Sequence, residues 1–242
     1  GAPMADLAAA AWADRVDLTA HGFYKTPGLE PFVADGRTSS APFHYFSYGA
    51  AVVDVEVDCL TGSARLARAD LCMDVGAPLA PALDVGQVEG AFSQGAGWAL
   101  LEDVVRGDGP GRAWVRPPGA MATRGPGTYK LPSAGDAPPD LRVSLLPGAP
   151  CAATAATVHS SKAVGEPPLA LGLAAHLAVR DAISAARADP RRGGGPSDES
   201  GGGWFELQLP ATVEAIRLAL GEDAVTAAAG AGVGGEVPAL SL

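Results

Sequence analysis

A single acid, Glu166, lies within a stretch of small and apolar residues in the C-terminal half of the chain. The stretch reads SKAVGEPPLALGLAAHLAV, and from Pro167 to Val179 it contains no Asp, Glu, Lys or Arg. Two prolines directly after the acid are typical of the first turn of a helix, where no N–H partner is required. A carboxylate between a helix N-terminus and apolar surroundings could act as a general base. An acid that only caps the helix is the alternative, and residue types alone leave both open.

A second candidate, Gln94, lies in the segment DVGQVEGAFSQGAGWALLED at residues 84–103. The apolar residues of this segment recur at helical spacing, which predicts a helix. Three glycines should each weaken that helix by about 1 kcal/mol relative to alanine, so we expect a backbone or a ligand to approach them closely; they are Gly90, Gly95 and Gly97. A glutamine beside such glycines can hydrogen-bond a polar cofactor, whereas an exposed or internally satisfied glutamine is the alternative.

The remaining candidate groups give weaker signals. The histidines have no HxH or HxxxH spacing, and His176 is interpreted as a satisfied core histidine rather than a metal ligand. Ser160, Ser161 and Lys162 could form a serine–lysine nucleophile, but no neighbouring motif for a base or an oxyanion hole supports one. The runs RGDGPG and RGPG lack the order of a phosphate-binding loop and are predicted to be turns.

Composition limits the class of protein. The 242 residues are 48% hydrophobic and 18% charged, which is enough to bury a substantial core. A net charge of -10 argues against binding to nucleic acid or to an anionic membrane surface, and no uncharged apolar stretch reaches the length of a membrane span. The three cysteines form no CxxC, so no iron–sulfur cluster or structural zinc is expected within the chain, and a reducing, cytoplasmic compartment is predicted.

The sequence pattern predicts the strands and helices that must position these groups. Together they indicate an α+β fold, with mixed or antiparallel strands packed against helices. Alternating apolar and acidic residues indicate the first strand, and LTGS at 60–63 indicates a turn after it. Asp84 and Gln87 resemble a capping box, and Thr212 is a candidate cap for a short later helix. Strands are expected over 45–59, 64–73 and 140–146, and helices over 5–14, 84–103, 167–188 and 211–220.

Composition also divides the chain into three parts. Residues 1–188 contain the candidate functional residues. Residues 189–203, DPRRGGGPSDESGGG, are predicted to form a flexible loop, and residues 204–242 to hold one short helix and a poorly ordered Ala/Gly-rich tail. The abrupt start, without the basic region of a signal peptide, suggests a fragment of a longer protein.

Seven motifs stand out as a set. In chain order they are GFYKTP (22–27), PFHYFSYGAA (42–51), VEVDCLTG (55–62), MDVGAPLAPALDVGQVEGAFSQGAGW (73–98), TRGPGTYKLP (123–132), RVSLL (142–146) and SSKAVGEPPL (160–169). In order and spacing they resemble the C-terminal part of the molybdopterin-binding region of the xanthine dehydrogenase family. The resemblance covers residues 6–187 and, more weakly, 207–220.

The resemblance implies an oxidoreductase of purine catabolism. Enzymes of this family hydroxylate hypoxanthine and xanthine to urate at a molybdenum–molybdopterin centre, and electrons leave through two [2Fe–2S] clusters to FAD and then to NAD. The cluster domains, the flavin domain and the first half of the molybdenum region are absent from this sequence, so the isolated chain is expected to be inactive. The family also implies a homodimer in the cytoplasm or the peroxisome.

The resemblance assigns roles to the candidate residues. Glu166, in the GEPP motif, is the general base that deprotonates the attacking oxygen at molybdenum. Gln94 hydrogen-bonds the pterin or an oxygen near the metal, so its side chain is expected within about 10 Å of Glu166. No side chain of the chain is expected to ligate a metal. The backbone that lines the cofactor is expected to come from Lys162, Ala163, Val164 and Gly165.

Two other functions remain as alternatives. An aldehyde oxidase-type hydroxylase would keep the fold and change the substrate, although GEPP leans towards purines. A non-catalytic assembly or interaction module derived from this domain is the other, and the intact Glu166 and Gln94 argue against it.

Overall fold

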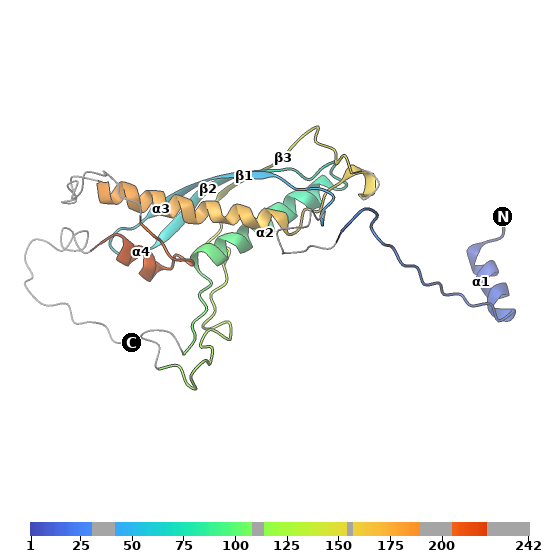
Figure 1. Cartoon of the computed structure of the whole chain (residues 1–242), viewed down its shortest axis with the longest axis horizontal. Helices are drawn as coiled ribbons and strands as arrows, with labels where there is room; N and C mark the ends of the chain where they lie inside the picture. The colour runs from blue at the N-terminus through green and yellow to red at the C-terminus, as the bar shows by residue number, and fades with distance from the viewer. Residues whose placement is uncertain (31–41, 108–113, 154–156, 189–204, 222–242) are drawn as a thin grey trace, which may run out of the picture. The chain divides into compact units, whose positions relative to one another are not determined.

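The computed structural model describes residues 1–30, 42–107, 114–153, 157–188 and 205–221 (Figure 1). The chain forms two compact units, Gly1–His44 and Tyr45–Leu242. The first unit contains helix α1 (Met4–Ala13), which has no buried residue. All other helices and strands of the described residues belong to the second unit. The predicted loop at 189–203 and the tail beyond 221 lie outside the described residues, and the division at residue 189 stays a prediction.

A three-stranded mixed sheet forms the centre of the second unit. Strand β1 (Gly49–Val57) pairs antiparallel with β2 (Ala64–Met73), and β2 pairs parallel with β3 (Asp140–Leu145). The predicted turn between β1 and β2 is confirmed: Asp58 N–H donates to the Ser63 carbonyl at 2.8 Å, and Gly62 adopts a φ of 79°. The three predicted strands and the α+β class are therefore confirmed.

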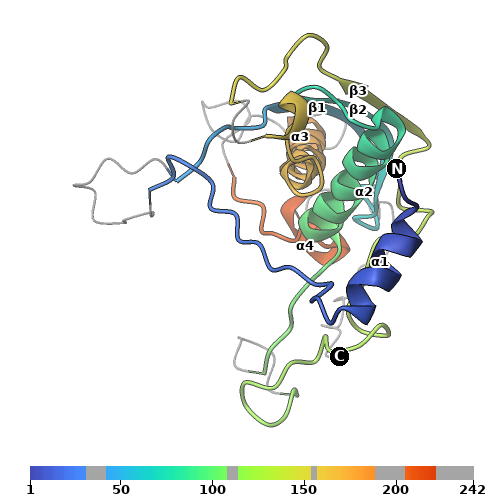
Figure 2. The same ribbon diagram turned by 90° about the vertical axis from the view of Figure 1, so that its right-hand side faces the viewer.

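Helices cover one face of the sheet (Figure 2). Helix α2 (Pro81–Leu100) packs against β3, and α3 (Leu173–Ala188) packs against β1 and α2. A 3₁₀ helix, η2 (Pro167–Gly172), leads directly into α3 and crosses α2. Two short elements complete the fold: η1 (Val158–Ser160) and α4 (Val213–Ala219).

The caps of two helices give opposite results for the sequence predictions. The Thr212 hydroxyl accepts a hydrogen bond from the Ala215 N–H at 3.3 Å, so the predicted cap of α4 is confirmed. The predicted capping box at Asp84 and Gln87 is wrong, because α2 begins earlier, at Pro81. The proline ring presets the backbone for the first helical position, so both residues fall inside the helix.

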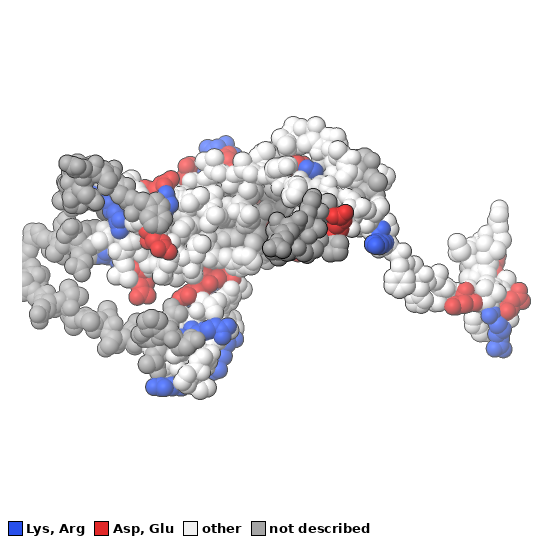
Figure 3. Space-filling model, viewed as in Figure 1, with Lys and Arg blue, Asp and Glu red and all other residues white. Residues whose placement is uncertain are grey.

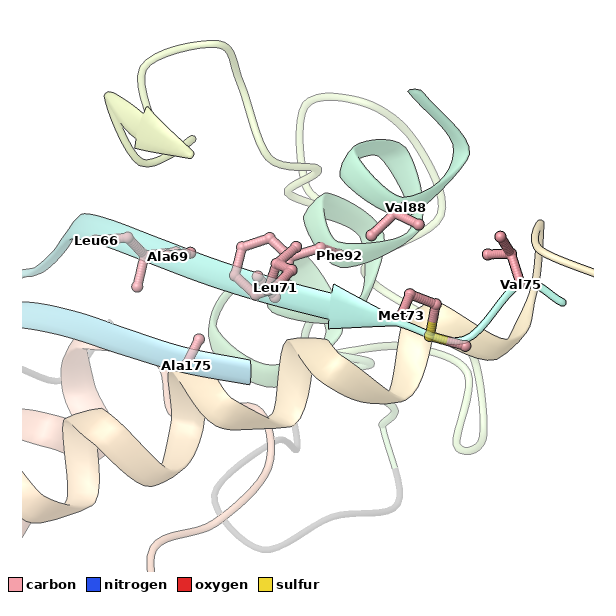
Figure 4. Close-up of a cluster of buried hydrophobic side chains, with 9 residues drawn as sticks. Leu66, Ala69, Leu71, Met73, Val75, Val88, Phe92 and Ala175 are labelled. Carbon is pink, nitrogen blue, oxygen red and sulfur yellow. The ribbon is translucent and has the colours of Figure 1, made fainter. Parts of the chain in front are cut away.

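The core lies between the sheet and the helices (Figure 4). Leu66, Ala69, Leu71 and Met73 of β2 pack against Val88 and Phe92 of α2 and Ala175 of α3. A second cluster joins Val179 and Ile183 of α3 to Ile216 of α4. The helical stretch Pro167–Ala188 is long and apolar enough to cross a membrane by length and composition alone. In this fold its buried side chains serve as core residues.

The outer face of the sheet carries several ion pairs. Arg68 contacts Asp70 at 2.6 Å, and Arg142 contacts Asp140 at 2.8 Å. The hydrogen bond from Arg68 lowers the pKa of Asp70, and that from Arg142 lowers the pKa of Asp140. Each of these pairs lies within one strand, and Arg68 also contacts Asp140 of the neighbouring strand at 3.8 Å. Opposite charges on adjacent strands of one face stabilise the sheet.

The close approach expected at the glycines of α2 occurs at two of the three. A Cβ on Gly95 would overlap the carbonyl oxygen of Leu169, and a Cβ on Gly172 would overlap the backbone of Gly95. A Cβ on Gly97 would overlap side-chain atoms of Pro132. The expected approach of a backbone is confirmed at Gly95, whereas the close neighbours of Gly97 are side chains and a Cβ on Gly90 would meet nothing within 4 Å.

Candidate active site

Glu166 follows by four residues the point where the chain bonds to the segment after β2, at the end of the sheet where β1 begins: the Lys162 N–H donates to the Val75 carbonyl at 2.9 Å. Glu166 occupies the N-cap position of η2, yet its side chain makes no capping hydrogen bond and is exposed. Its backbone carbonyl accepts a hydrogen bond from the Leu169 N–H at 3.1 Å, which holds the first turn of η2. Helix capping therefore does not account for the carboxylate.

An open hollow of about 570 Å³ is lined in part by Glu166. A hollow of this volume is within the range of pockets that bind small molecules or cofactors. Apart from Glu166, the residues that line it are small or apolar and carry no charge; they are Ala163, Gly165, Pro167, Leu169 and Ala170. The arrangement therefore presents one proton-accepting group beside a surface on which a ligand can be held without competing side chains.

The segment before Glu166 is anchored at its beginning and open towards its end. The N–H of Ala163 donates to the Tyr45 hydroxyl at 3.0 Å, and the Val164 side chain packs against the core. Among the described residues, the N–H groups of Val164 and Gly165 donate to no protein acceptor. These two donors are available to acceptor atoms of a ligand, whereas the N–H of Ala163 is already engaged.

The side chain of Lys162 is also engaged. Its ammonium group lies 2.5 Å from a carboxylate oxygen of Asp74 and donates to the Phe46 carbonyl at 2.9 Å. Lys162 can therefore reach a cofactor only through its backbone, whose N–H already donates to the Val75 carbonyl at 2.9 Å.

The two glutamines of α2 lie at different positions along the site. The side-chain nitrogen of Gln87 lies 3.5 Å from the point that a Cβ on Gly165 would occupy. Gln94 is exposed seven residues later, which is about 10 Å further along the helix axis. Its neighbour Gly95 packs on Leu169 and Gly172 of η2. The proximity of Gln94 to Glu166 stays a prediction.

Gln87 is a candidate that the sequence interpretation missed, because the residue was assigned to a capping box. A signal for it was present in the sequence. Residues separated by seven positions share a helix face. If Gln94 belongs to the site, Gln87 on the same face is therefore also a candidate.

Two further groups are accounted for by the fold. His176 is buried, and its Nε2 lies 3.2 Å from the Leu207 carbonyl, which confirms a satisfied core histidine. The Tyr129 hydroxyl donates to the buried carboxylate of Glu102 at 2.5 Å. Within the described ranges, no group of three or more His, Cys, Asp and Glu side chains could hold a metal ion.

Comparison with known proteins identifies the family. Residues 1–138, more than half of the chain, match the model of the molybdopterin cofactor-binding domain. The chain therefore belongs to the molybdopterin cofactor-binding domain family.

Its relatives point to one kind of enzyme within that family. A xanthine dehydrogenase of Oryza sativa subsp. japonica is 47% identical over 216 residues, which cover 89% of this chain and 15% of the relative. The xanthine dehydrogenase/oxidase of Felis catus is 46% identical over 214 residues, which cover 88% of this chain and 15% of the relative. The chain thus spans about 15% of the length of these curated relatives. The resemblance inferred from the motifs is confirmed.

Solved structures share the fold. Quinoline 2-oxidoreductase from Pseudomonas putida 86 is 25% identical with a TM-score of 0.53, and the match covers 69% of this chain and 18% of that chain. An aldehyde oxidoreductase from Desulfovibrio desulfuricans is 22% identical with a TM-score of 0.53, over 76% of this chain and 17% of that one.

Proposed function

We propose that the chain is the part of a xanthine dehydrogenase-type molybdenum hydroxylase that carries the catalytic general base, Glu166. The placement of its carboxylate carries the proposal. The group is exposed, makes no capping hydrogen bond and borders a hollow whose other lining residues are uncharged. The identity of 47% to a xanthine dehydrogenase supports a purine as the substrate.

The residues around the hollow fit a molybdopterin cofactor. The N–H groups of Val164 and Gly165 can donate to its polar atoms, and the amide of Gln87 is close enough to Gly165 to join them. A side chain at residue 165 would narrow the hollow that glycine leaves open. When bound, the cofactor supplies the two-electron oxidation of the substrate. Gln94 remains a proposed further donor.

Glu166 moves the proton of the reaction. As an ionised carboxylate it accepts the proton of the oxygen nucleophile, which makes that oxygen more reactive towards an electron-poor carbon of the substrate. The uncharged lining beside it offers no competing acceptor. Pro167, Leu169 and Ala170 give the hollow an apolar side next to Glu166.

The rest of the electron path belongs to the proposal as well. [2Fe–2S] clusters, FAD and the NAD-binding site would lie in parts of a longer protein outside this sequence, as would most of the substrate pocket. A homodimer and a cytoplasmic location are likewise proposed from the resemblance to xanthine dehydrogenases.

Replacement of Glu166 by Gln in the full-length holoenzyme tests the base. Glutamine keeps the shape and removes the proton acceptor, so kcat should fall by about 10⁴-fold, at the top of the range for loss of a general base. Molybdenum and pterin contents should stay near those of the wild type, because the backbone of residues 162–165 is unchanged. Glu166→Asp should also be slow, because its carboxylate is withdrawn by about one C–C bond.

Glu214→Gln is the matched control, since Glu214 is an exposed acid on α4 away from the hollow. It should keep wild-type turnover. A fully metallated Glu166→Gln enzyme with normal turnover would show that the base lies elsewhere.

The choice of substrates separates the two hydroxylase functions. The proposed enzyme should reduce NAD with hypoxanthine and xanthine and should oxidise a small aromatic aldehyde poorly. The aldehyde oxidoreductase fold match makes the reverse preference the second candidate. Steady-state kcat/KM for the three substrates distinguishes them.

A further inference from the structure

A buried ion pair lies four residues before Glu166. The ammonium group of Lys162 and the carboxylate of Asp74 are 2.5 Å apart, and their side chains are only 10% and 5% exposed. Removing two charges from water is costly, so such a pair persists where further hydrogen bonds satisfy both partners. Here the second oxygen of Asp74 accepts from the Gly76 N–H at 2.9 Å, and Lys162 also donates to the Phe46 carbonyl at 2.9 Å.

The pair ties together three segments that are distant in sequence. Asp74 directly follows β2, Phe46 precedes β1, and Lys162 leads into Glu166. Backbone hydrogen bonds join the same segments. Asp74 N–H donates to the Tyr48 carbonyl at 2.8 Å, and Lys162 N–H donates to the Val75 carbonyl at 2.9 Å. The charged pair therefore lies at the centre of a junction that fixes where residue 162 leaves the sheet.

The chain enters this junction in an unfavourable conformation. His159 and Ser160 have φ values of 49° and 60°, in the left-handed region that residues with a Cβ rarely adopt. Such residues persist where the surroundings over-determine them. The Ser160 carbonyl accepts from both Ala77 N–H at 2.9 Å and Cys151 N–H at 2.8 Å. Gly76 has no side chain to obstruct this approach, since a Cβ there would lie 2.5 Å from the same oxygen.

Between the junction and η2 the chain makes few hydrogen bonds. Only Ala163, Val164 and Gly165 separate Lys162 from Glu166, and among the described residues the last N–H in this segment with a protein acceptor is that of Ala163. The Val164 side chain packs against the core, and on the far side Gly95 and Gly172 fix η2 against α2. The junction is therefore the anchor that precedes the Glu166 carboxylate in the chain, and η2 is the anchor that follows it.

We propose that Lys162 and Asp74 form a positioning pair that holds the Glu166 carboxylate in place for its reaction. This inference rests on the proposed function of Glu166. Neither charged group lines the hollow, so the pair acts through the backbone of residues 162–166 and not by contact with the substrate. Its loss should lower kcat and leave KM almost unchanged.

The test uses the double variant Lys162→Met/Asp74→Leu in the full-length holoenzyme. It replaces the ion pair by apolar side chains of similar size, so neither partner is left as an uncompensated buried charge. We expect kcat per bound molybdenum to fall about 10- to 100-fold, because a displacement near 1 Å can cost that much. Hydrogen exchange at the amides of Lys162 and Ala163 should accelerate at least tenfold, while the amides of β2 stay protected.

Arg65→Met is the matched control. It breaks the exposed Arg65–Glu56 pair of the same sheet, whose atoms are 2.9 Å apart, and should change neither exchange nor turnover. The proposal is overturned if the double variant keeps wild-type exchange in residues 162–163, or if exchange accelerates while kcat per molybdenum is unchanged. The two proposals fail in different ways. Normal turnover of Glu166→Gln would refute the role of Glu166 as the base. Unchanged amide exchange in the double variant would refute the positioning role of Lys162 and Asp74, whatever its turnover.

Discussion

At the scale of single residues, Glu166 and Lys162 differ in where their neighbours come from. Glu166 is marked as a candidate by a local pattern, a lone acid before Pro-Pro. The partner of Lys162 could not be predicted, because Asp74 is 88 residues away and only the fold brings the two together. Gln87 was assigned the wrong role for a related reason. Its spacing from Asp84 resembles a capping box, but the helix begins earlier, at Pro81, so Gln87 lies inside the helix.

The Tyr129–Glu102 hydrogen bond leads to a prediction at the same scale. Glu102 is 8% exposed, and its hydrogen bond with Tyr129 raises the pKa of the phenol. A raised folded-state pKa means that this contribution to stability is fully present below pH ~10 and is lost as pH rises through the folded-state value. Tyr129→Phe should therefore lower the free energy of unfolding at pH 8, and its difference from wild type should shrink at pH 11.

Urea denaturation at the two pH values measures this difference. Tyr24→Phe, at an exposed tyrosine of the first unit, is the control and should change neither value. An equal loss of stability at pH 8 and pH 11 would contradict the role assigned to the hydroxyl.

At the scale of elements, the periodic patterns predicted the strands and the turn between them. They did not predict which segments pack against each helix, because those segments are distant in sequence. The alternation of acids and valines located β1, and the glycine in LTGS located the following turn. Gly95 of α2 indicated that another segment packs closely on the helix but not which one. That segment is η2, whose Leu169 and Gly172 lie more than 70 residues further along the chain. Periodicity could not distinguish Gly90, which faces open space, from Gly95, which does not.

The crossing of α2 and η2 can be tested with two alanine substitutions in one helix. Gly95→Ala places a methyl group on the Leu169 carbonyl, so it should destabilise the protein by about 1–3 kcal/mol or more through overpacking. Gly90→Ala meets no atom within 4 Å and should stabilise it by up to about 1 kcal/mol through helix propensity. Urea denaturation of both variants should give changes of opposite sign, and changes of the same sign would refute the close crossing.

At the scale of the whole molecule, the chain leaves apolar surface uncovered in both units. Helix α1 buries none of its residues. In the second unit, Leu173 and Leu177 of α3 are each 47% exposed and lie four residues apart on one helix face. The sequence has no charged residue from Pro167 to Val179, and the described surface along the middle of α3 is uncharged in Figure 3. An uncharged helix face with exposed leucines is a candidate interaction site, and the chain spans only about 15% of the length of its curated relatives. We therefore expect another part of a longer protein to cover this face.

A charge at residue 177 tests that expectation in the full-length holoenzyme. If the face is covered there, Leu177→Glu buries a carboxylate without a partner, and the free energy of unfolding should fall by more than about 2 kcal/mol. Leu60→Glu is the matched control, because Leu60 is 61% exposed in the turn between β1 and β2, at the opposite end of β1 from Gly49, which meets Leu171 just before α3. Thermal denaturation and molybdenum content report the outcome: Leu177→Glu should lower both while Leu60→Glu changes neither. Equal tolerance of the two glutamates would mean that α3 faces solvent in the complete protein, and that the apolar face is not an internal interface.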